Sequence, residues 1–301
     1  MSSKIFRLKI AVALITAICL AIVLLAPSPV VPAITCKADS NGTPLLTEDF
    51  SGVPQHIVDD AAEAAAGLFG NNRQKQDEFI SQLLAMYLEA KDKDIVLISN
   101  SGGWGWSPVE AFPHGHEFVI GIDAKLNSLD YDTLWLDHYR TAKTLNGCIS
   151  EFMFAAGLYP TKAEDLAVRI EFLTSHIPNI RVILSGESNG STICGDTMQI
   201  LKDNPQVYSI QLGPPSWNNG TESDRMLVLK SNGSTPDAFS QGDIITIIRS
   251  NLEALFGISQ EYPGHILFYI GAPGHDYGWQ YEGVSSQVLA FLDNNFNPEK
   301  Q

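Results

Sequence analysis

From Asp94 onward the chain alternates short apolar runs with longer amphipathic stretches, and this alternation limits the folds open to it. Each run is too short for a typical helix and is rich in β-branched residues, so we expect six β-strands, at residues 94–98, 133–136, 181–184, 207–212, 226–229 and 265–270. Strands that are apolar throughout are buried on both faces, as in parallel sheets covered by helices. The sequence therefore predicts an α/β fold with a mainly parallel sheet and helices on both faces.

The stretches between these runs show the spacing of amphipathic helices. We expect seven helical regions, at His56–Phe69, Arg73–Ala90, Val119–Leu129, Cys148–Ile177, Thr192–Lys202, Ile244–Phe256 and Val284–Phe296. The first two precede any strand candidate and are an addition at the N-terminal side of the sheet. Residues 55–301 are predicted to form one domain of this kind.

A G-x-S-x-G pentapeptide, Gly186 to Gly190, lies directly between the predicted strand 181–184 and the predicted helix at Thr192. At a strand-to-helix junction this pattern forms a sharp turn that raises the serine hydroxyl above the sheet edge. Glycines are needed there because side chains would collide with the neighbouring strand and helix. The alternative is an ordinary turn before a helix capped by Ser191. The position favours Ser188 as a nucleophile.

With this motif in this place, the chain resembles the α/β-hydrolase superfamily of serine hydrolases. The resemblance implies the chain order nucleophile, acid, histidine. His275, in a Gly-His pair after the last predicted strand, occupies the position of the base. The acid is expected after the strand 226–229, where Asp237 is the first choice. Asp243 is the alternative acid, although it is also placed to cap the helix that follows.

An oxyanion hole needs two N–H groups, and the resemblance implies two sources for them. One is the backbone of Asn189, immediately after the nucleophile. The other is the loop after the first sheet strand, where Gly103 or Trp104 would donate. A plain turn at the strand end would also use these glycines. Trp104 and Trp106 either line an acyl pocket or pack beneath the loop, and Trp217 is expected to border the site.

The resemblance has limits that bear on the substrate. No β-hairpin is expected before Asp94, and only Gly213–Arg225 separates two consecutive predicted strands. That segment is too short for the helical cap domain that many relatives insert. An open site without a cap domain is therefore expected.

The N-terminus carries a candidate membrane anchor. Three basic residues within residues 1–9 precede an uncharged segment, Ile10–Ala26, and prolines follow it. Seventeen residues lie at the lower limit for a transmembrane helix and above the usual length of a signal-peptide core. We expect an uncleaved signal anchor with residues 1–9 in the cytoplasm, a linker over residues 27–54, and the remaining chain outside the cytoplasm.

Charge and cysteine content exclude several classes of function. The 34 acidic residues outnumber the 19 basic ones, and this balance disfavours nucleic-acid binding. It equally disfavours a broad electrostatic attraction to anionic lipid, so contact with a membrane is expected through the N-terminal helix only. Outside the anchor, Cys36, Cys148 and Cys194 lack C-x-x-C spacing, so no structural zinc site is expected. An exported protein could pair two of these three cysteines in a disulfide, and the sequence does not choose which two. His114 and His116 form an H-x-H pair without a third ligand. No metal and no cofactor are expected.

The sequence thus favours a membrane-tethered serine hydrolase outside the cytoplasm that cleaves an ester, thioester or amide through an acyl-enzyme at Ser188. Esterase activity is preferred over peptidase activity because it is chemically less demanding. Two alternatives remain open. One is a catalytically inactive fold that serves as a binding module, and the other is an acyltransferase that uses the same three residues.

Overall fold

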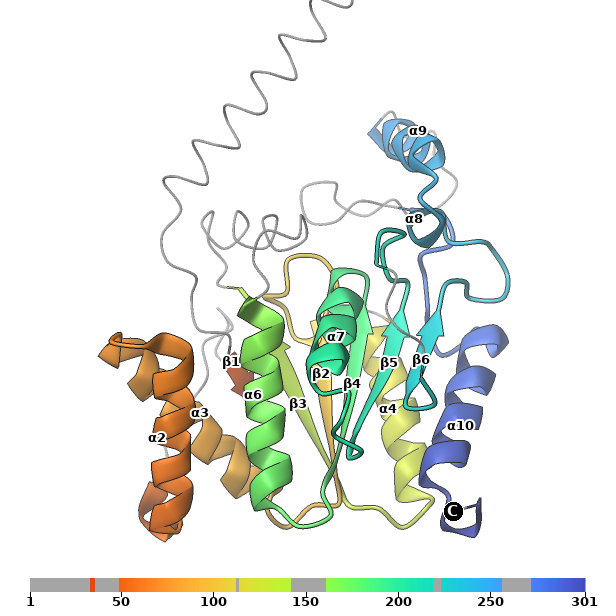
Figure 1. Ribbon diagram of the computed structural model, residues 1–301. Helices are drawn as coiled ribbons and strands as arrows, with labels where there is room; N and C mark the ends of the chain where they lie inside the picture. Colours follow the sequence, from red (N-terminus) through yellow and green to blue (C-terminus); the bar gives the residue numbers. More distant parts are fainter. Residues whose placement is uncertain are drawn as a thin grey trace, which may run out of the picture.

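The protein forms a central sheet covered by helices on both faces, as the computed structural model in Figure 1 shows. The structure describes residues 33–35, 49–111, 114–141, 161–218, 223–255 and 272–300. Within these described ranges the sheet has six strands, in the order β1-β3-β2-β4-β5-β6. The strands are β1 (Ala33–Thr35), β2 (Ile95–Asn100), β3 (Thr133–Tyr139), β4 (Arg181–Glu187), β5 (Val207–Leu212) and β6 (Met226–Leu229).

Five of these strands, β2 to β6, are parallel, and β1 pairs antiparallel with β3 at the edge of the sheet. The α-helices are α2 (Gln55–Phe69), α3 (Arg73–Ala90), α4 (Gly115–Asn127), α6 (Thr161–His176), α7 (Asn189–Ile200), α8 (Ala238–Gln241), α9 (Ile244–Leu255) and α10 (Glu282–Phe296). Short 3-10 helices occur at Phe50–Gly52, Val109–Ala111 and Pro298–Lys300.

The sheet is buried on both faces, which explains why its strands are apolar throughout. In β2, Val96 and Ile98 pack on one side with residues of α3, α6 and α7. Their neighbours Ile95 and Leu97 point to the other side, where they pack with residues of α4 and α10. Because successive side chains of a strand alternate between faces, each run needs apolar residues at nearly every position. The predicted α/β fold with a parallel sheet between helices is confirmed.

The helices α2 and α3 pack against each other in a cluster of their own, which includes Phe172 of α6. They lie beyond the β1 edge of the sheet in Figure 1. The sequence predicted these two helices within one residue of their observed ends. The predicted region Cys148–Ile177 is described only from residue 161, where α6 begins, and the predicted strand 265–270 lies outside the described residues.

Several elements differ from the sequence-based expectation, since α4 begins at Gly115, four residues before the predicted start at Val119, and α8 was not predicted. The strand β1 lies inside the predicted linker, and its three residues were too few to give a pattern. Helix α7 begins at Asn189, three residues before the predicted start at Thr192. The residue at its N-cap is Ser188, whose side chain makes no capping hydrogen bond. Ser191 therefore lies inside the helix and is not its cap.

In the part of the chain that the structure describes, no helix is both long enough and apolar enough to cross a membrane. The predicted anchor Ile10–Ala26 lies outside the described residues. The division into a cytoplasmic tip, an anchor, a linker and one domain stays a prediction.

Candidate active site

Ser188 occupies the junction between β4 and α7 with a backbone that serine rarely adopts. Its φ is 53° and its ψ is −119°, a region that strongly favours glycine. Holding a serine there costs about 1–3 kcal/mol, which the surrounding structure must supply. The result is a sharp turn at the carboxyl edge of the sheet. This is the backbone geometry expected for a nucleophile elbow.

The two glycines of the pentapeptide let the elbow pack tightly. A Cβ on Gly186 would lie 2.5 Å from the carbonyl oxygen of Gly190. A Cβ on Gly190 would lie 2.0 Å from the carbonyl oxygen of Asn100, at the end of β2. Both obstacles are backbone atoms, which cannot rotate aside. The start of α7 is therefore pressed against the ends of β2 and β4.

This packing makes the substitution Gly190→Ala strongly destabilising. We expect the free energy of unfolding to fall by about 2 kcal/mol or more, because the new methyl group collides with the Asn100 carbonyl. The matched control is Gly67→Ala in α2, where a Cβ meets nothing within 4 Å. There we expect no loss, or a gain of up to about 1 kcal/mol, from higher helix propensity. Thermal unfolding measures both, and an equal response of the two variants would contradict this account.

His275 and Asp237 form a hydrogen-bonded pair. The His275 Nδ1 lies 2.8 Å from the Asp237 Oδ2, and the Asp237 side chain is completely buried. Asp237 precedes α8 and caps it, since its Oδ1 accepts hydrogen bonds from the backbone N–H groups of Phe239 and Ser240. The carboxylate is therefore fixed before it meets the imidazole. The structure brings together the two residues that the sequence proposed as acid and base.

Two further donors to this carboxylate were not predicted from the sequence. The Tyr277 hydroxyl and the Ser240 hydroxyl each donate to the Asp237 Oδ2, both at 2.7 Å. Burial acts to raise the pKa of Asp237, but the hydrogen bonds from His275, Tyr277 and Ser240 outweigh it, so this pKa is lowered. Asp237 is therefore ionised at neutral pH. The sequence offered one signal that Tyr277 belongs to the site, namely its position two residues after His275.

The alternative acid, Asp243, has a different set of partners. Its carboxylate accepts hydrogen bonds from the backbone N–H and the hydroxyl of Thr246 in α9. Those bonds lower its pKa. Asp243 thus caps α9, the simpler of the two roles considered for it, while Asp237 holds the histidine.

The imidazole of His275 lies beside the elbow without a hydrogen bond to the serine. The Ser188 N–H donates to the Leu212 carbonyl at 2.8 Å, and a Cβ on the next residue, Gly213, would lie 2.5 Å from the His275 Cε1. The His275 Nε2 is buried and has no hydrogen-bond partner among the described residues. Catalytic hydrogen bonds of this kind often form only when substrate binds. Because Nδ1 contacts Asp237, the Nε2 nitrogen on the other side of the ring is the one without a partner in the described part of the chain.

The loop after β2 lies against the elbow. A Cβ on Gly102 would lie 3.5 Å from the Ser188 Cβ, and the Asn189 side-chain amide donates to the Gly103 carbonyl at 3.5 Å. Buried Arg140 secures this loop, since its side chain donates to the Ser101 carbonyl and its backbone N–H to the Gly105 carbonyl. The loop is thus beside Ser188, where an oxyanion donor is needed. The use of Gly103 or Trp104 as that donor stays a prediction.

The three tryptophans assigned to the site differ in their surroundings. The rings of Trp104 and Trp106 stack on each other with centroids 5.9 Å apart. Trp217 is exposed and lies edge-on to Phe239, which in turn lies edge-on to His275. Trp217 therefore borders the histidine through one intervening ring. A pocket role for Trp104 and Trp106 stays a prediction.

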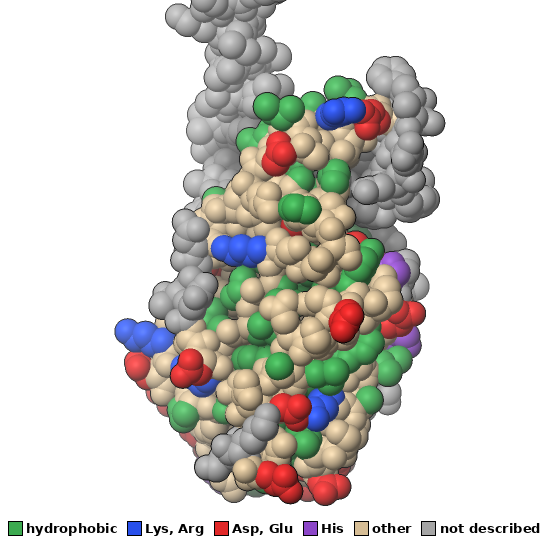
Figure 2. All heavy atoms as spheres, turned by 90° about the vertical axis from the view of Figure 1, so that its right-hand side faces the viewer, with side chains coloured by type: hydrophobic (Ala, Val, Ile, Leu, Met, Phe, Trp, Pro, Cys, Tyr) green, Lys and Arg blue, Asp and Glu red, His purple; other side chains and the backbone are tan. Residues whose placement is uncertain are grey.

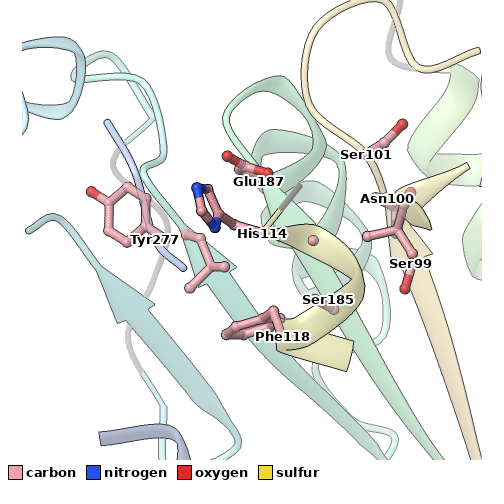
Figure 3. Close-up of a pocket in the computed structure, with 11 residues that line it drawn as sticks. Ser99, Asn100, Ser101, His114, Phe118, Ser185, Glu187 and Tyr277 are labelled. Carbon is pink, nitrogen blue, oxygen red and sulfur yellow. The ribbon is translucent and has the colours of Figure 1, made fainter. Parts of the chain in front are cut away.

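A small pocket of about 30 Å³ opens next to the elbow. Figure 3 shows it between the end of β2, the start of α4 and Tyr277. Glu187, the residue before the nucleophile, lines it together with His114. Burial raises the pKa of Glu187, while His275 acts in the opposite direction. The pocket was not foreseen from the sequence, because its walls come from segments far apart in the chain.

No group of three His, Cys, Asp or Glu side chains placed to hold a metal ion occurs within the described ranges. His114 lies at the pocket, 3.9 Å from the Asp276 carboxylate, and His116 lies against the ring of Trp135. Cys194 is buried as a free thiol, and burial raises its pKa to about 12. Cys36 and Cys148 lie outside the described residues.

Comparisons with known proteins add little at the level of sequence. No protein-family model and no curated protein matches this chain. Among solved structures, it aligns with a Trichoderma reesei cutinase in complex with a C11Y4 phosphonate inhibitor, at 12% identity and a TM-score of 0.41, over 81% of this chain and 92% of that one. It also aligns with a cutinase-like protein from Cryptococcus sp., at 14% identity and a TM-score of 0.37, over 69% and 98% of the two chains. Because both TM-scores are below 0.5, these alignments do not assign a function, and the functional argument rests on the geometry of the site.

Proposed function

We propose that this protein is a serine esterase that works through an acyl-enzyme at Ser188. The observation that carries the proposal is the buried Asp237–His275 pair, which lies beside a serine held at φ 53° after a parallel strand. A structural turn has no need of a strained serine, nor of a buried carboxylate that orients a neighbouring imidazole. The three groups occur in the chain order that the resemblance implied.

In the first step, the Ser188 Oγ attacks the carbonyl carbon of an ester while its proton passes to the His275 Nε2. The C–O bond to the leaving alcohol then breaks, and His275 returns the proton to that alcohol. In the second step, water attacks the carbonyl carbon of the acyl-enzyme while His275 takes its proton. The bond to the Ser188 Oγ then breaks, and His275 returns the proton to Ser188. The Asp237 carboxylate keeps the Nδ1 protonated, so that the Nε2 is the nitrogen able to accept.

Negative charge on the carbonyl oxygen is stabilised by N–H groups at the start of α7. The Asn189 N–H lies in the first turn of that helix, where backbone N–H groups lack partners within the helix and the dipole favours an anion. A second donor comes from the loop at Gly103 or Trp104. Each such donor is worth about 3 kcal/mol in the transition state.

Two further parts of the proposal concern the group that accepts the acyl chain and the compartment in which the domain lies. Hydrolysis and acyl transfer use the same three residues and differ only in the acceptor that attacks the acyl-enzyme. A tether formed by Ile10–Ala26 would place this domain outside the cytoplasm. Product analysis with added alcohols or amines separates hydrolysis from transfer.

A fluorophosphonate probe tests the proposal directly. We expect the full-length chain, purified in mild detergent, to react at Ser188, with the adduct located by peptide mass spectrometry. Only a serine activated by a base reacts quickly with such a probe, so His275→Ala should abolish labelling. A folded protein that stays unlabelled would instead favour the catalytically inactive binding module.

A further inference from the structure

Helix α9 exposes a row of large apolar side chains to solvent. Ile244, Ile245, Ile248 and Leu252, here called the α9 face, recur at helical spacing, and their exposure ranges from 49% for Leu252 to 81% for Ile245. They make up four of the seven large hydrophobic residues that are exposed in the described part of the chain. A row of this size on one helix points to a contact with another apolar surface.

Helix α9 is connected to the active site through α8, which precedes it in the chain. Asp237 caps α8, and two residues, Gly242 and Asp243, separate α8 from α9. A Cβ on Gly242, between the two helices, would lie 2.8 Å from the Ser216 hydroxyl, which brings exposed Trp217 beside them. Trp217 then leads through Phe239 to His275. Helix α9 is thus linked through α8 to Phe239, whose ring contacts His275.

The N-terminal segment enters the domain from this same edge of the sheet. In the antiparallel pair, Ala33 lies opposite Tyr139, the last residue of β3, and therefore at the carboxyl edge where Ser188 also stands. Figure 1 shows α8 and α9 beyond this edge. Seven residue steps separate Ala33 from Ala26, the end of the predicted anchor, and an extended chain of that length spans at most about 25 Å. A bilayer that holds the anchor is therefore close to the carboxyl edge.

We propose that α9 lies on the surface of the bilayer that holds the N-terminal segment, with the α9 face and Trp217 in contact with lipid. The active site then faces the membrane, and its substrate class is an acyl ester carried by a lipid of the outer leaflet. The choice of substrate rests on the proposed esterase function, whereas the membrane contact of α9 does not. Burial of the four side chains in the interface stabilises this orientation.

Charge favours a contact of apolar rather than electrostatic origin. The chain carries a net charge of −15, and Arg249, the basic residue of α9, forms an ion pair with Glu253 at 2.7 Å. Neither feature attracts anionic headgroups. Figure 2 shows hydrophobic side chains at the upper end of the described part of the molecule, with both basic and acidic side chains beside them. The contact should therefore form on zwitterionic lipid and be insensitive to salt.

Photocrosslinking from the acyl chains tests this orientation on the full-length protein. The chain is reconstituted in nanodiscs of phosphatidylcholine that contain a diazirine-bearing phosphatidylcholine, irradiated, and mapped by peptide mass spectrometry. We expect adducts in Ile10–Ala26 and in the peptide that carries Ile245 and Ile248. The double substitution Ile245→Asp and Ile248→Asp should lower the α9 adducts about fivefold or more, since charges are costly in lipid, while the adducts at Ile10–Ala26 stay as an internal reference.

The control uses exposed isoleucines of two other helices. Ile120 of α4 and Ile200 at the end of α7 are each about half exposed, and the double substitution Ile120→Asp and Ile200→Asp should leave the α9 adducts unchanged. An α9 peptide crosslinked no more than the peptide of Ile200 would overturn the proposal, as would a nanodisc-bound dimer that covers α9. Absence of adducts at Ile10–Ala26 would overturn it too. Each of these results leaves fluorophosphonate labelling of Ser188 unaffected, so failure of the orientation and failure of the esterase function are distinguishable.

Discussion

Replacement of Ser188 by alanine is expected to lower kcat/KM for an ester substrate by about a thousandfold or more. The hydroxyl is the atom that forms the acyl-enzyme, and no other described serine combines a positive φ with a neighbouring imidazole. Binding of substrate and the oxyanion donors would remain. Steady-state kinetics on a soluble short-chain ester measures the loss, and fluorophosphonate labelling should vanish with it.

The same variant should fold as well as the wild-type chain. The side chain of Ser188 makes no capping hydrogen bond, and alanine meets the same positive φ as serine does. A matched control is Thr192→Val, one turn along α7, where the replaced hydroxyl is buried and has no hydrogen-bond partner in the described part of the chain. That variant should keep both stability and activity. Full activity of Ser188→Ala would exclude the proposed mechanism.

The fold could be predicted from the sequence because its elements are defined by local patterns. The five parallel strands each form an apolar run, since both faces of the sheet are buried, and α3 has apolar residues at helical spacing on its buried side. The strand β1 has only three residues and gains its structure from pairing with β3, so no local pattern marks it. Element types were therefore easier to predict than edge strands or helix starts.

The candidate site was predicted only in part, for the same physical reason. Ser188 and His275 stand next to glycines at the ends of predicted elements, and Asp237 follows a strand, so each had a positional signal. Tyr277 reaches Asp237 across 40 residues of sequence. Arg140 reaches the Ser101 carbonyl, in the loop after β2, across 39 residues. Contacts of that separation depend on how the elements pack, and a single sequence does not record them.

Replacement of Asp237 by asparagine is expected to lower kcat by about a thousandfold or more. The Asp237 Oδ2 accepts from His275, Tyr277 and Ser240, and its Oδ1 accepts from two backbone N–H groups. An amide offers donors at one of these positions, so it favours the His275 tautomer whose Nε2 carries the proton. That tautomer cannot accept the proton of Ser188. Steady-state kinetics of Asp237→Asn beside Asp243→Asn decides which carboxylate is the acid, and a comparable loss in the second variant would assign the role to Asp243.

The difference in unfolding free energy between the wild-type chain and Asp237→Asn should also depend on pH, in a defined direction. Because the pKa of Asp237 is lowered in the folded state, its ionised form contributes stability above the unfolded-state value of about 3.9 and loses that contribution as the pH falls through the folded-state pKa. The wild-type chain should therefore be more stable than the variant at neutral pH, and the difference should shrink below about pH 4. Chemical denaturation at a series of pH values measures this difference. A difference that stays constant down to pH values well below the unfolded-state pKa would mean that the Asp237 charge does not contribute to folding. It would also remove the electrostatic basis for the orientation of His275.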